Sequence, residues 1–540
     1  MIFSPELRQQ YLRKSEAEGA IRTVINAQLD NTPIRVLDTT TGRLYDRQAR
    51  IAIFKEDREY GELLSSIMKY SDRRMERVEE VVGNYFRCVM LSHRWEEKEP
   101  LLHDIQENAV YKLSPVGGIA KLQSFCKIAR DAGYRWAWSD TCCIDKNNST
   151  ELQQSLNAMF VWYRHSVLTI VYLSDVPPSS QPGGLARSEW NTRGWTVQEF
   201  LAPKLIRFYQ KNWTLYLDDS SPNHKDSVAI RRELEDATGI HPQSLISFQP
   251  GMRNVREKLQ WASRRVTTMQ EDIAYSLFGI FGVQLHVIYG ENKQRALGRL
   301  LQEIVAQSGD ITALDWVGKP SEFNSCLPAD ISSYRAPPHI LPPLSEDEMQ
   351  TSLSSLRNAA VLKWASKLYD QLDALSAPRF ANCRLHLPCI AFRVTEVRLS
   401  QNQGTPHTYE VKADGLHRTS ITTGEKMSQF SRASPTRQAF YLVRPWDRDL
   451  LQLPDPDDTQ SEDIFWDAPE ISQEYGDLEL RKFNEQALQL IAHLERPFSA
   501  FLLEQQRGRE YKRVASDHDI IVTIEDMAAI CEMVTTLEIL

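Results

Sequence analysis

Four short apolar runs, separated by stretches with helical periodicity, constrain the fold of this chain more than any other feature. The runs are residues 86–91, 135–139, 167–173 and 205–209. Runs that are apolar at nearly every position are typical of strands buried on both faces of a parallel sheet. We therefore predict an α/β fold in which these segments are parallel strands of one open, doubly wound sheet.

The segments between the runs predict helices. Apolar residues recur at helical spacing between the first two runs, and Gly133 follows as a glycine that ends a helix. Before the third run, Asn148 and Glu151 form an N-terminal capping pattern, and we expect a helix over residues 150–164. Right-handed crossovers then bring the ends of the strands to one edge of the sheet, where open α/β proteins hold ligands.

Polar and aromatic side chains follow the first three predicted strands and form the candidate site. Glu199 belongs to this candidate site, because a carboxylate between two apolar runs is expected near the end of a sheet. The candidate substrate-binding residues are Ser92, Arg94, Trp95, Asp140 and Trp195.

Structural alternatives stay open for each of these residues. Glu199 would instead pair with Arg193 or cap a helix. The two tryptophans would belong to the core or to an interface. Asp140 would hold loop backbone, and Arg94 would be a surface residue.

The composition excludes several classes of partner and ligand. The chain has 540 residues and a formal net charge of -9, so no global basic field favours nucleic acid. Eight cysteines without a CxxC pair or a Cys/His cluster at zinc spacing favour reduced thiols and no metal site. The first residues lack the pattern of a signal peptide, and polar residues interrupt the apolar stretch 273–289. We expect a cytoplasmic protein without a membrane-spanning segment.

Familiar motifs of cofactor-dependent chemistry are absent from the sequence. It contains no GxxxxGK[ST] phosphate loop, no GxGxxG, no HExxH and no GxSxG. An NTPase, a dinucleotide-dependent dehydrogenase, a zincin and an ordinary α/β-hydrolase therefore lack their usual signatures. We expect no bound cofactor.

Shifts in composition divide the chain into five expected parts. They are an N-terminal segment at 1–84 that packs on the next part, the parallel-sheet domain at 85–215, a helical extension at 216–317, a proline-rich extended linker at 318–345, and a separate C-terminal α+β domain, rich in strands, at 346–540. Within the last part, the acidic residues 453–463 are expected to form a solvated loop. That part shows no catalytic signature.

Three blocks of sequence resemble, in order and spacing, the fungal heterokaryon-incompatibility (HET) domain. They are FRCVMLSHRW at 86–95, the block at 136–176 that begins WAWSDTCCID, and SEWNTRGWTVQEFLAPKLIRFY at 188–209. Residues 34–44 are similar to the usual opening of such proteins. Residues 258–304 look like the segment that follows the domain. The resemblance covers roughly residues 34–317.

The resemblance implies a role in fungal self/non-self recognition, a form of innate immunity in which the HET domain triggers programmed cell death. It implies self-association into a homo-oligomer, or contact with other incompatibility proteins. The HET domain is also similar to TIR domains, which have a flavodoxin-like sheet. Some TIR domains cleave NAD with a glutamate after the third strand, and Glu199 matches that position. NAD is then a candidate substrate, and whether the chain is an enzyme stays open.

The sequence departs from the family pattern at two positions near the candidate site. Glu96 stands where the family usually has glycine, and Lys146 stands where it usually has glutamine. Glycine would let the backbone approach a phosphate, and a glutamate adds negative charge where an anion would bind.

Overall fold

The computed structural model describes residues 13–69, 74–178, 180–338, 344–356, 358–401, 406–448 and 472–540. The chain divides into two compact units. The first unit comprises Met1–Gly251 and Arg264–Gly290, and the second comprises Met252–Ser263 and Glu291–Leu540. The chain therefore passes from one unit to the other at three points along the sequence. The acidic residues 453–463 lie outside the described residues.

The first unit is built around a six-stranded sheet with the order β2-β1-β4-β3-β5-β6. Its strands are β1 (Arg35–Asp38), β2 (Leu44–Asp46), β3 (Cys88–His93), β4 (Trp136–Trp138), β5 (Leu168–Tyr172) and β6 (Ile206–Tyr209). The four strands from β3 to β6 are parallel, which confirms the strands expected from the apolar runs.

Beyond the four predicted strands, the sheet continues with an antiparallel edge. β1 pairs antiparallel with both β2 and β4. A tight turn joins β1 to β2, in which Asp38 accepts hydrogen bonds from the backbone of Thr40 and Thr41 and Gly42 has a φ of 69°. Strands joined by so short a turn can only pair antiparallel.

Among the parallel strands, β3 lies between β4 and β5, and β6 lies beyond β5. The connection from β3 to β4 and the one from β4 to β5 therefore run in opposite directions across the sheet. A reversal of this kind opens a crevice outside the carboxyl ends of the strands. All six residues of β3 are buried, so its end lies deep in the unit.

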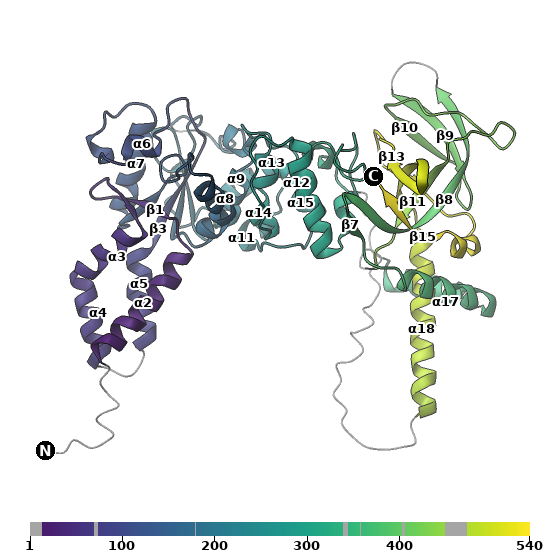
Figure 1. Ribbon diagram of the computed structural model, residues 1–540, viewed down its shortest axis with the longest axis horizontal. Helices are drawn as coiled ribbons and strands as arrows, with labels where there is room; N and C mark the ends of the chain where they lie inside the picture. The colour runs from purple at the N-terminus through teal and green to yellow at the C-terminus, as the bar shows by residue number, and fades with distance from the viewer. Residues whose placement is uncertain are drawn as a thin grey trace. The chain divides into compact units, whose positions relative to one another are not determined.

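Helices cover this sheet and extend it. They are α2 (Lys14–Asp30), α3 (Arg47–Glu56), α4 (Arg58–Lys69), α5 (Arg74–Phe86), α6 (Leu102–Ile105), α7 (Gly118–Asp131), α8 (Ser149–Arg164), α9 (Thr196–Leu201), α10 (Val228–Thr238), α11 (Pro242–Ser247), α13 (Asp272–Tyr275) and α14 (Phe278–Phe281). The expected crossover helices α7 and α8 are confirmed, and Asn148 caps α8 as predicted. The first four helices form a group beside β1 (Figure 1).

The second unit is dominated by a nine-stranded sheet. Its strands are β7 (Arg379–Ala381), β8 (Arg384–Gln401), β9 (His407–Ala413), β10 (Thr419–Thr423), β11 (Phe440–Pro445), β12 (Phe498–Gln505), β13 (Glu510–Arg513), β14 (Ile520–Val522) and β15 (Val534–Ile539). β12 and β13 form a hairpin, joined by a turn at Arg507–Arg509.

The long strand β8 organises this sheet because it pairs with four other strands. Its first half pairs with β15, its middle with β11 and its second half with β9. Because β15 also pairs with β13, the strands β8, β11, β12, β13 and β15 close on themselves. Closure of this kind leaves fewer unpaired backbone groups at sheet edges.

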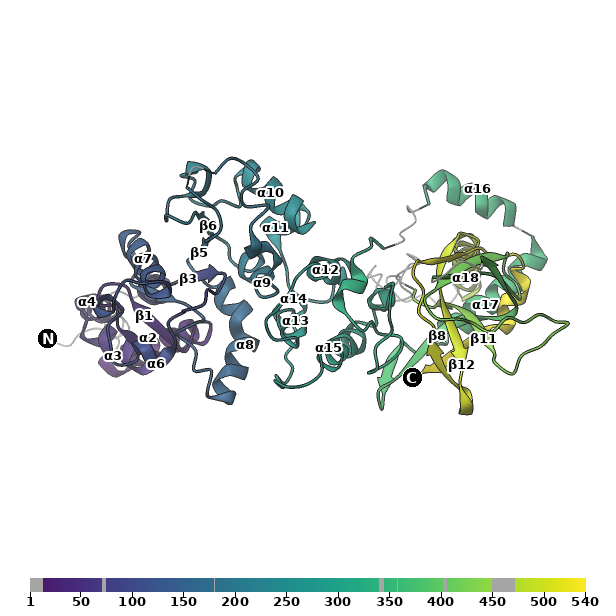
Figure 2. The same cartoon turned by 90° about the horizontal axis from the view of Figure 1, so that it is seen from above.

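Helices complete the second unit. They are α12 (Val255–Ala262), α15 (Lys293–Ser308), α16 (Glu346–Leu356), α17 (Ala359–Asp373) and α18 (Ser472–Leu494). Both views show α17 and α18 beside the strands (Figures 1 and 2). Leu368 of α17 and Leu490 of α18 are buried in one apolar core with Phe392 of β8. Among the described helices of the chain, none is long and apolar enough to cross a membrane.

Most of the proline-rich stretch is part of the second unit rather than an extended linker. Asn324 donates to the carbonyl of Ile539 at 2.8 Å, and the Ser325 amide donates to that of Leu540. The guanidinium of Arg513 donates to the carbonyls of Leu314 and Trp316 at 2.7 and 2.9 Å. These bonds hold residues 311–336 against β13 and β15. The domain boundaries expected from the sequence otherwise stay predictions.

Replacing Arg513 should therefore loosen the second unit. Its guanidinium lies 3.9 Å from the ring centroid of Trp316 and 4.1 Å from that of Phe501. Arg513→Ala removes both ring contacts and leaves two buried carbonyls unpaired, so we expect a loss of about 3 kcal/mol in the free energy of unfolding. Urea denaturation measures it. The exposed Arg507, on the same hairpin, is the control. Equal stability of Arg513→Ala and Arg507→Ala would contradict the expected role.

Candidate functional site

The site begins at the carboxyl end of β3, where Ser92 and His93 are the last two residues of the strand. Successive side chains of a strand point to opposite faces of the sheet. Ser92 is fully buried and His93 is 6% exposed. Both polar side chains therefore need partners inside the protein.

The segment after β5 brings Glu199 to this strand end. A short 3-10 helix, η2 (Glu189–Thr192), is capped by Ser188, and α9 follows it. All six residues of α9 are buried, and Glu199 is 6% exposed. Glu199 therefore lies at the end of the sheet and not on an open helix face.

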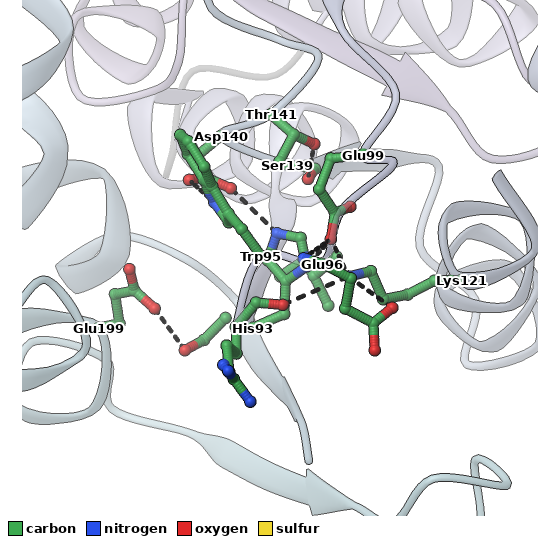
Figure 3. Close-up of polar contacts among 12 residues, drawn as sticks. His93, Trp95, Glu96, Glu99, Lys121, Ser139, Asp140, Thr141 and Glu199 are labelled. Atoms are coloured by element: carbon green, nitrogen blue, oxygen red, sulfur yellow. Dashed lines mark hydrogen bonds and ion pairs between the residues drawn. The ribbon is translucent and has the colours of Figure 1, made fainter. Parts of the chain in front are cut away.

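A chain of hydrogen bonds joins three residues at this point. The indole Nε1 of Trp190 donates to Oγ of Ser92 at 2.9 Å. Ser92 in turn donates to Oε2 of Glu199, a contact drawn as a dashed line in Figure 3. Trp190 is 1% exposed, so the whole chain of bonds is shielded from water. The predicted proximity of Glu199 and Ser92 is thus present in the structure.

The surroundings of Glu199 favour its neutral form. Burial raises the pKa of Glu199 to about 8, and the negative charge of Asp140 acts in the same direction. The hydrogen bond from Ser92 and the charges of Arg193 and Arg265 oppose this rise without cancelling it. Glu199 is therefore a protonated acid at neutral pH, which is a property typical of functional carboxyl groups and of some structural networks.

Asp140, which follows β4, collects a second set of polar contacts (Figure 3). Its Oδ1 lies 3.1 Å from Nε2 of His93, and its Oδ2 accepts a hydrogen bond of 2.8 Å from Nε1 of Trp95. Burial raises the pKa of Asp140, but the hydrogen bonds from His93 and Trp95 and the charge of Lys146 bring it below its ordinary value. Asp140 is therefore the ionised carboxylate of the site.

Charged residues of the loops after β3 and β4, and Lys121 of α7, lie close to this set. The ammonium of Lys146 lies 3.7 Å from the ring centroid of Trp95, which is 46% exposed. Glu96 faces Lys121 at 3.6 Å, and Lys121 also pairs with Glu99 (Figure 3). The negative charge of Glu96 therefore faces a buried lysine that it shares with Glu99.

Two of the predicted site residues lie apart from this group. Arg94 is partly exposed and pairs with Glu189 at the surface. Trp195 is partly buried, and its Nε1 donates to Asp272 at 3.0 Å. Trp195 is therefore not a fully buried core residue. The structure brings together Ser92, Trp95, Asp140 and Glu199, and their roles toward a ligand stay predictions.

Two buried cations that the sequence did not suggest hold α9 at its ends. Arg265 donates to the carbonyl of Arg193 and to Oγ1 of Thr196, both at 2.9 Å. Lys225 donates to the carbonyls of Leu201 and Pro203 at 3.3 and 2.7 Å. Burial lowers the pKa of Lys225 to about 7. No local pattern marks these residues, because each acts through contacts far away in the sequence. Among the described residues, no group of acidic, histidine and cysteine side chains is placed to hold a metal ion.

Comparison with known proteins identifies the region that holds most of this site. Residues 89–185 match the model of the family described as heterokaryon incompatibility protein (HET). This region is a HET domain.

The chain is also 37% identical over 236 residues to "Vegetative incompatibility protein HET-E-1" of Podospora anserina. The matched part is 42% of this chain and 16% of that protein, so the chain spans about a sixth of the length of the relative. No solved structure matches the chain. The stretch matched to the family contains Ser92, Trp95 and Asp140, whereas Glu199 lies beyond its end.

The burial of Glu199 predicts a pH dependence of stability. In the unfolded chain this carboxyl ionises near 4.5, whereas burial in the first unit raises its pKa to about 8. The stability contributed by Glu199 is therefore fully present below 4.5 and is lost as the pH rises toward 8. Glu199→Gln is neutral in both states. Relative to wild type it should gain up to about 1.4 kcal/mol per pH unit in this window.

Urea titrations at pH 5, 6.5 and 8 measure this gain. Glu107→Gln, at an exposed glutamate of the same unit, is the control and should follow wild type at every pH. A stability difference between Glu199→Gln and wild type that is constant with pH would show that Glu199 is ionised in the folded protein.

Proposed function

We propose that this chain acts in heterokaryon incompatibility, as the effector that triggers programmed cell death in fungal self/non-self recognition. The observation that carries the proposal is the HET domain itself, whose residue Ser92, at the end of β3, is hydrogen-bonded to the buried Glu199 of α9. The likeness to a vegetative incompatibility protein of Podospora anserina supports the same process.

The proposed mechanism is self-association of a TIR-like domain. The strand order supports this likeness, because the first of the four parallel strands lies between the second and the third, as in flavodoxin-like sheets. Partners of the chain are then further copies of itself or other incompatibility proteins. The cytoplasm is the proposed location, where fusing hyphae mix their contents.

Cell death should depend on the carboxyl group of Glu199. On overexpression in a fungal host, wild type and Glu107→Gln should kill, whereas Glu199→Gln should not. The substitution keeps the shape of the side chain and removes its ionisation, so we expect it to fold and to be expressed like wild type. Colony survival and the protein level in the same cells are the measurements. Killing by Glu199→Gln at wild-type level would end any proposal that involves this carboxyl.

Sedimentation of the purified chain distinguishes death by assembly alone from a mechanism in which the carboxyl group has a further role. If death follows from assembly alone, Glu199→Gln sediments as a monomer where wild type forms oligomers. If Glu199→Gln still assembles but does not kill, the carboxyl has a role beyond assembly.

The position of Glu199 favours a second candidate function, cleavage of NAD at the bond between nicotinamide and ribose. That bond breaks with its electron pair going to nicotinamide, which leaves as a neutral molecule. Water adds to C1′ of the ribose and gives up a proton, and ADP-ribose is the other product. The oxocarbenium character at C1′ is stabilised by an ionised carboxylate, as in glycoside hydrolysis.

In this second function, the ligand itself would help to ionise Glu199. The pyridinium of NAD carries a positive charge, and an opposite charge nearby favours the ionised carboxylate. The exposed ring of Trp95 is suited to stacking on a ligand ring, and Lys146 is suited to a phosphate.

Release of nicotinamide from NAD tests the enzymatic candidate. Activity should rise from pH 6 toward pH 8, because burial raises the pKa of Glu199 to about 8 and only its ionised form is active. Glu199→Gln should lose at least about 100-fold, and Glu107→Gln should keep the activity of wild type. The absence of nicotinamide release from a wild-type sample that is shown to be oligomeric would leave assembly as the mechanism.

A further inference from the structure

We propose that Trp190 and Ser92 are positioning residues, which hold Oε2 of Glu199 in place and leave Oε1 as the oxygen that faces a ligand. The proposal deepens the function of the Glu199 site and rests on that site having a ligand. It reassigns Ser92, which the sequence analysis treated as a substrate-binding residue, and it adds Trp190.

The hydrogen-bonding capacity of Ser92 carries the first step. A serine hydroxyl has one proton to donate, and an indole Nε1 is a donor only. Because Trp190 donates to Ser92, the hydroxyl proton of Ser92 is directed away from the indole. It is donated to Oε2 of Glu199. Ser92 is fully buried, so its hydroxyl has no open side to offer a ligand.

The two oxygens of Glu199 consequently differ. Oε2 accepts the hydrogen bond that Ser92 donates, so Oε2 does not carry a proton that points toward Ser92. In the described part of the chain, Ser92 is the hydrogen-bond partner of Glu199, and it contacts Oε2. With the hydroxyl proton of Ser92 donated to Oε2, the proton of the neutral acid resides on Oε1 and leaves from there on ionisation.

Several charged or titratable groups surround this carboxyl group. Asp140 disfavours its ionised form, whereas Arg193 and Arg265 favour it. Tyr163 of α8 also interacts electrostatically with Glu199, and its own pKa is raised by burial and then by that carboxylate. Ser92 is the group that forms a direct hydrogen bond, so its contribution is the one that single substitutions can isolate.

Trp138 of β4 offers a matched control for Trp190 of η2. Trp138 of β4 is fully buried like Trp190, but its Nε1 has no hydrogen-bond partner in the described part of the chain. Trp190→Phe and Trp138→Phe remove similar volumes from the same core, and only the first removes a hydrogen bond to Ser92. A change in the pKa of Glu199 that both variants share is therefore due to the loss of packing.

The measurement is the pKa of Glu199 in the full-length protein, from NMR titration of side-chain carboxyl ¹³C with labelled glutamate. Glu199→Gln assigns the signal by its loss. Ser92→Ala removes the donated bond and should raise the pKa of Glu199 by about 1 to 2 units. Trp190→Phe frees the hydroxyl to rotate and should raise that pKa by about half a unit. Trp138→Phe should leave it unchanged.

The outcomes separate this inference from the proposed function. Equal values in Trp190→Phe and Trp138→Phe overturn the role of Trp190, and an unchanged or lower pKa in Ser92→Ala overturns the whole proposal. If Trp190→Phe does not fold, Ser92→Ala decides alone. The expected order of pKa values in a protein that neither kills nor releases nicotinamide supports the positioning pair and refutes the proposed functions. If the protein kills or releases nicotinamide but the pKa values do not follow the expected order, the proposed function is supported and the positioning pair is refuted.

Discussion

Keeping the carboxyl group of Glu199 away from water costs free energy, and the arrangement of the first unit compensates for that cost. A buried carboxyl is tolerated when it is neutral and hydrogen-bonded. Ser92 supplies the hydrogen bond from the end of β3, and Arg265 supplies a nearby positive charge. Lys225 and Arg265 hold the two ends of α9 and thereby fix the helix that carries Glu199. These contacts join segments far apart in the sequence at one strand end.

The sequence predicts the parallel strands well because burial on both faces leaves a direct local signature. Each of the four apolar runs needs only its own composition to be recognised, and the crossover helix α8 needs only its periodicity and Asn148. The antiparallel pairing of β1 with β4 has no such signature. It depends on which strand is left with an open edge once the others have paired, and the sequence of β1 does not record that.

The residues of the candidate site could be predicted where they follow a strand that the sequence itself predicts. Ser92 and Asp140 follow strands, and Glu199 lies between two apolar runs, so their proximity follows from the topology. The two tryptophans of residues 188–200 show the limit. The residues around Trp190 and Trp195 in the sequence do not show which of the two is buried in the site. The chain turns at η2, so that Trp190 contacts Ser92 and Trp195 contacts Asp272. Proline content likewise predicted a linker, because composition reports local stiffness and not the bonds that join Asn324 and Ser325 to the end of the chain and to Arg513.

The division of the chain into interleaved units has a genetic consequence. Residues 252–263 belong to the second unit, yet the first unit is complete only with the segment 264–290, which contains Arg265. A recombination event between alleles that joins two chains at residue 251 would therefore preserve the sheet and Glu199 but replace the residue that holds the start of α9. An exchange that keeps the first unit intact must therefore extend to residue 290.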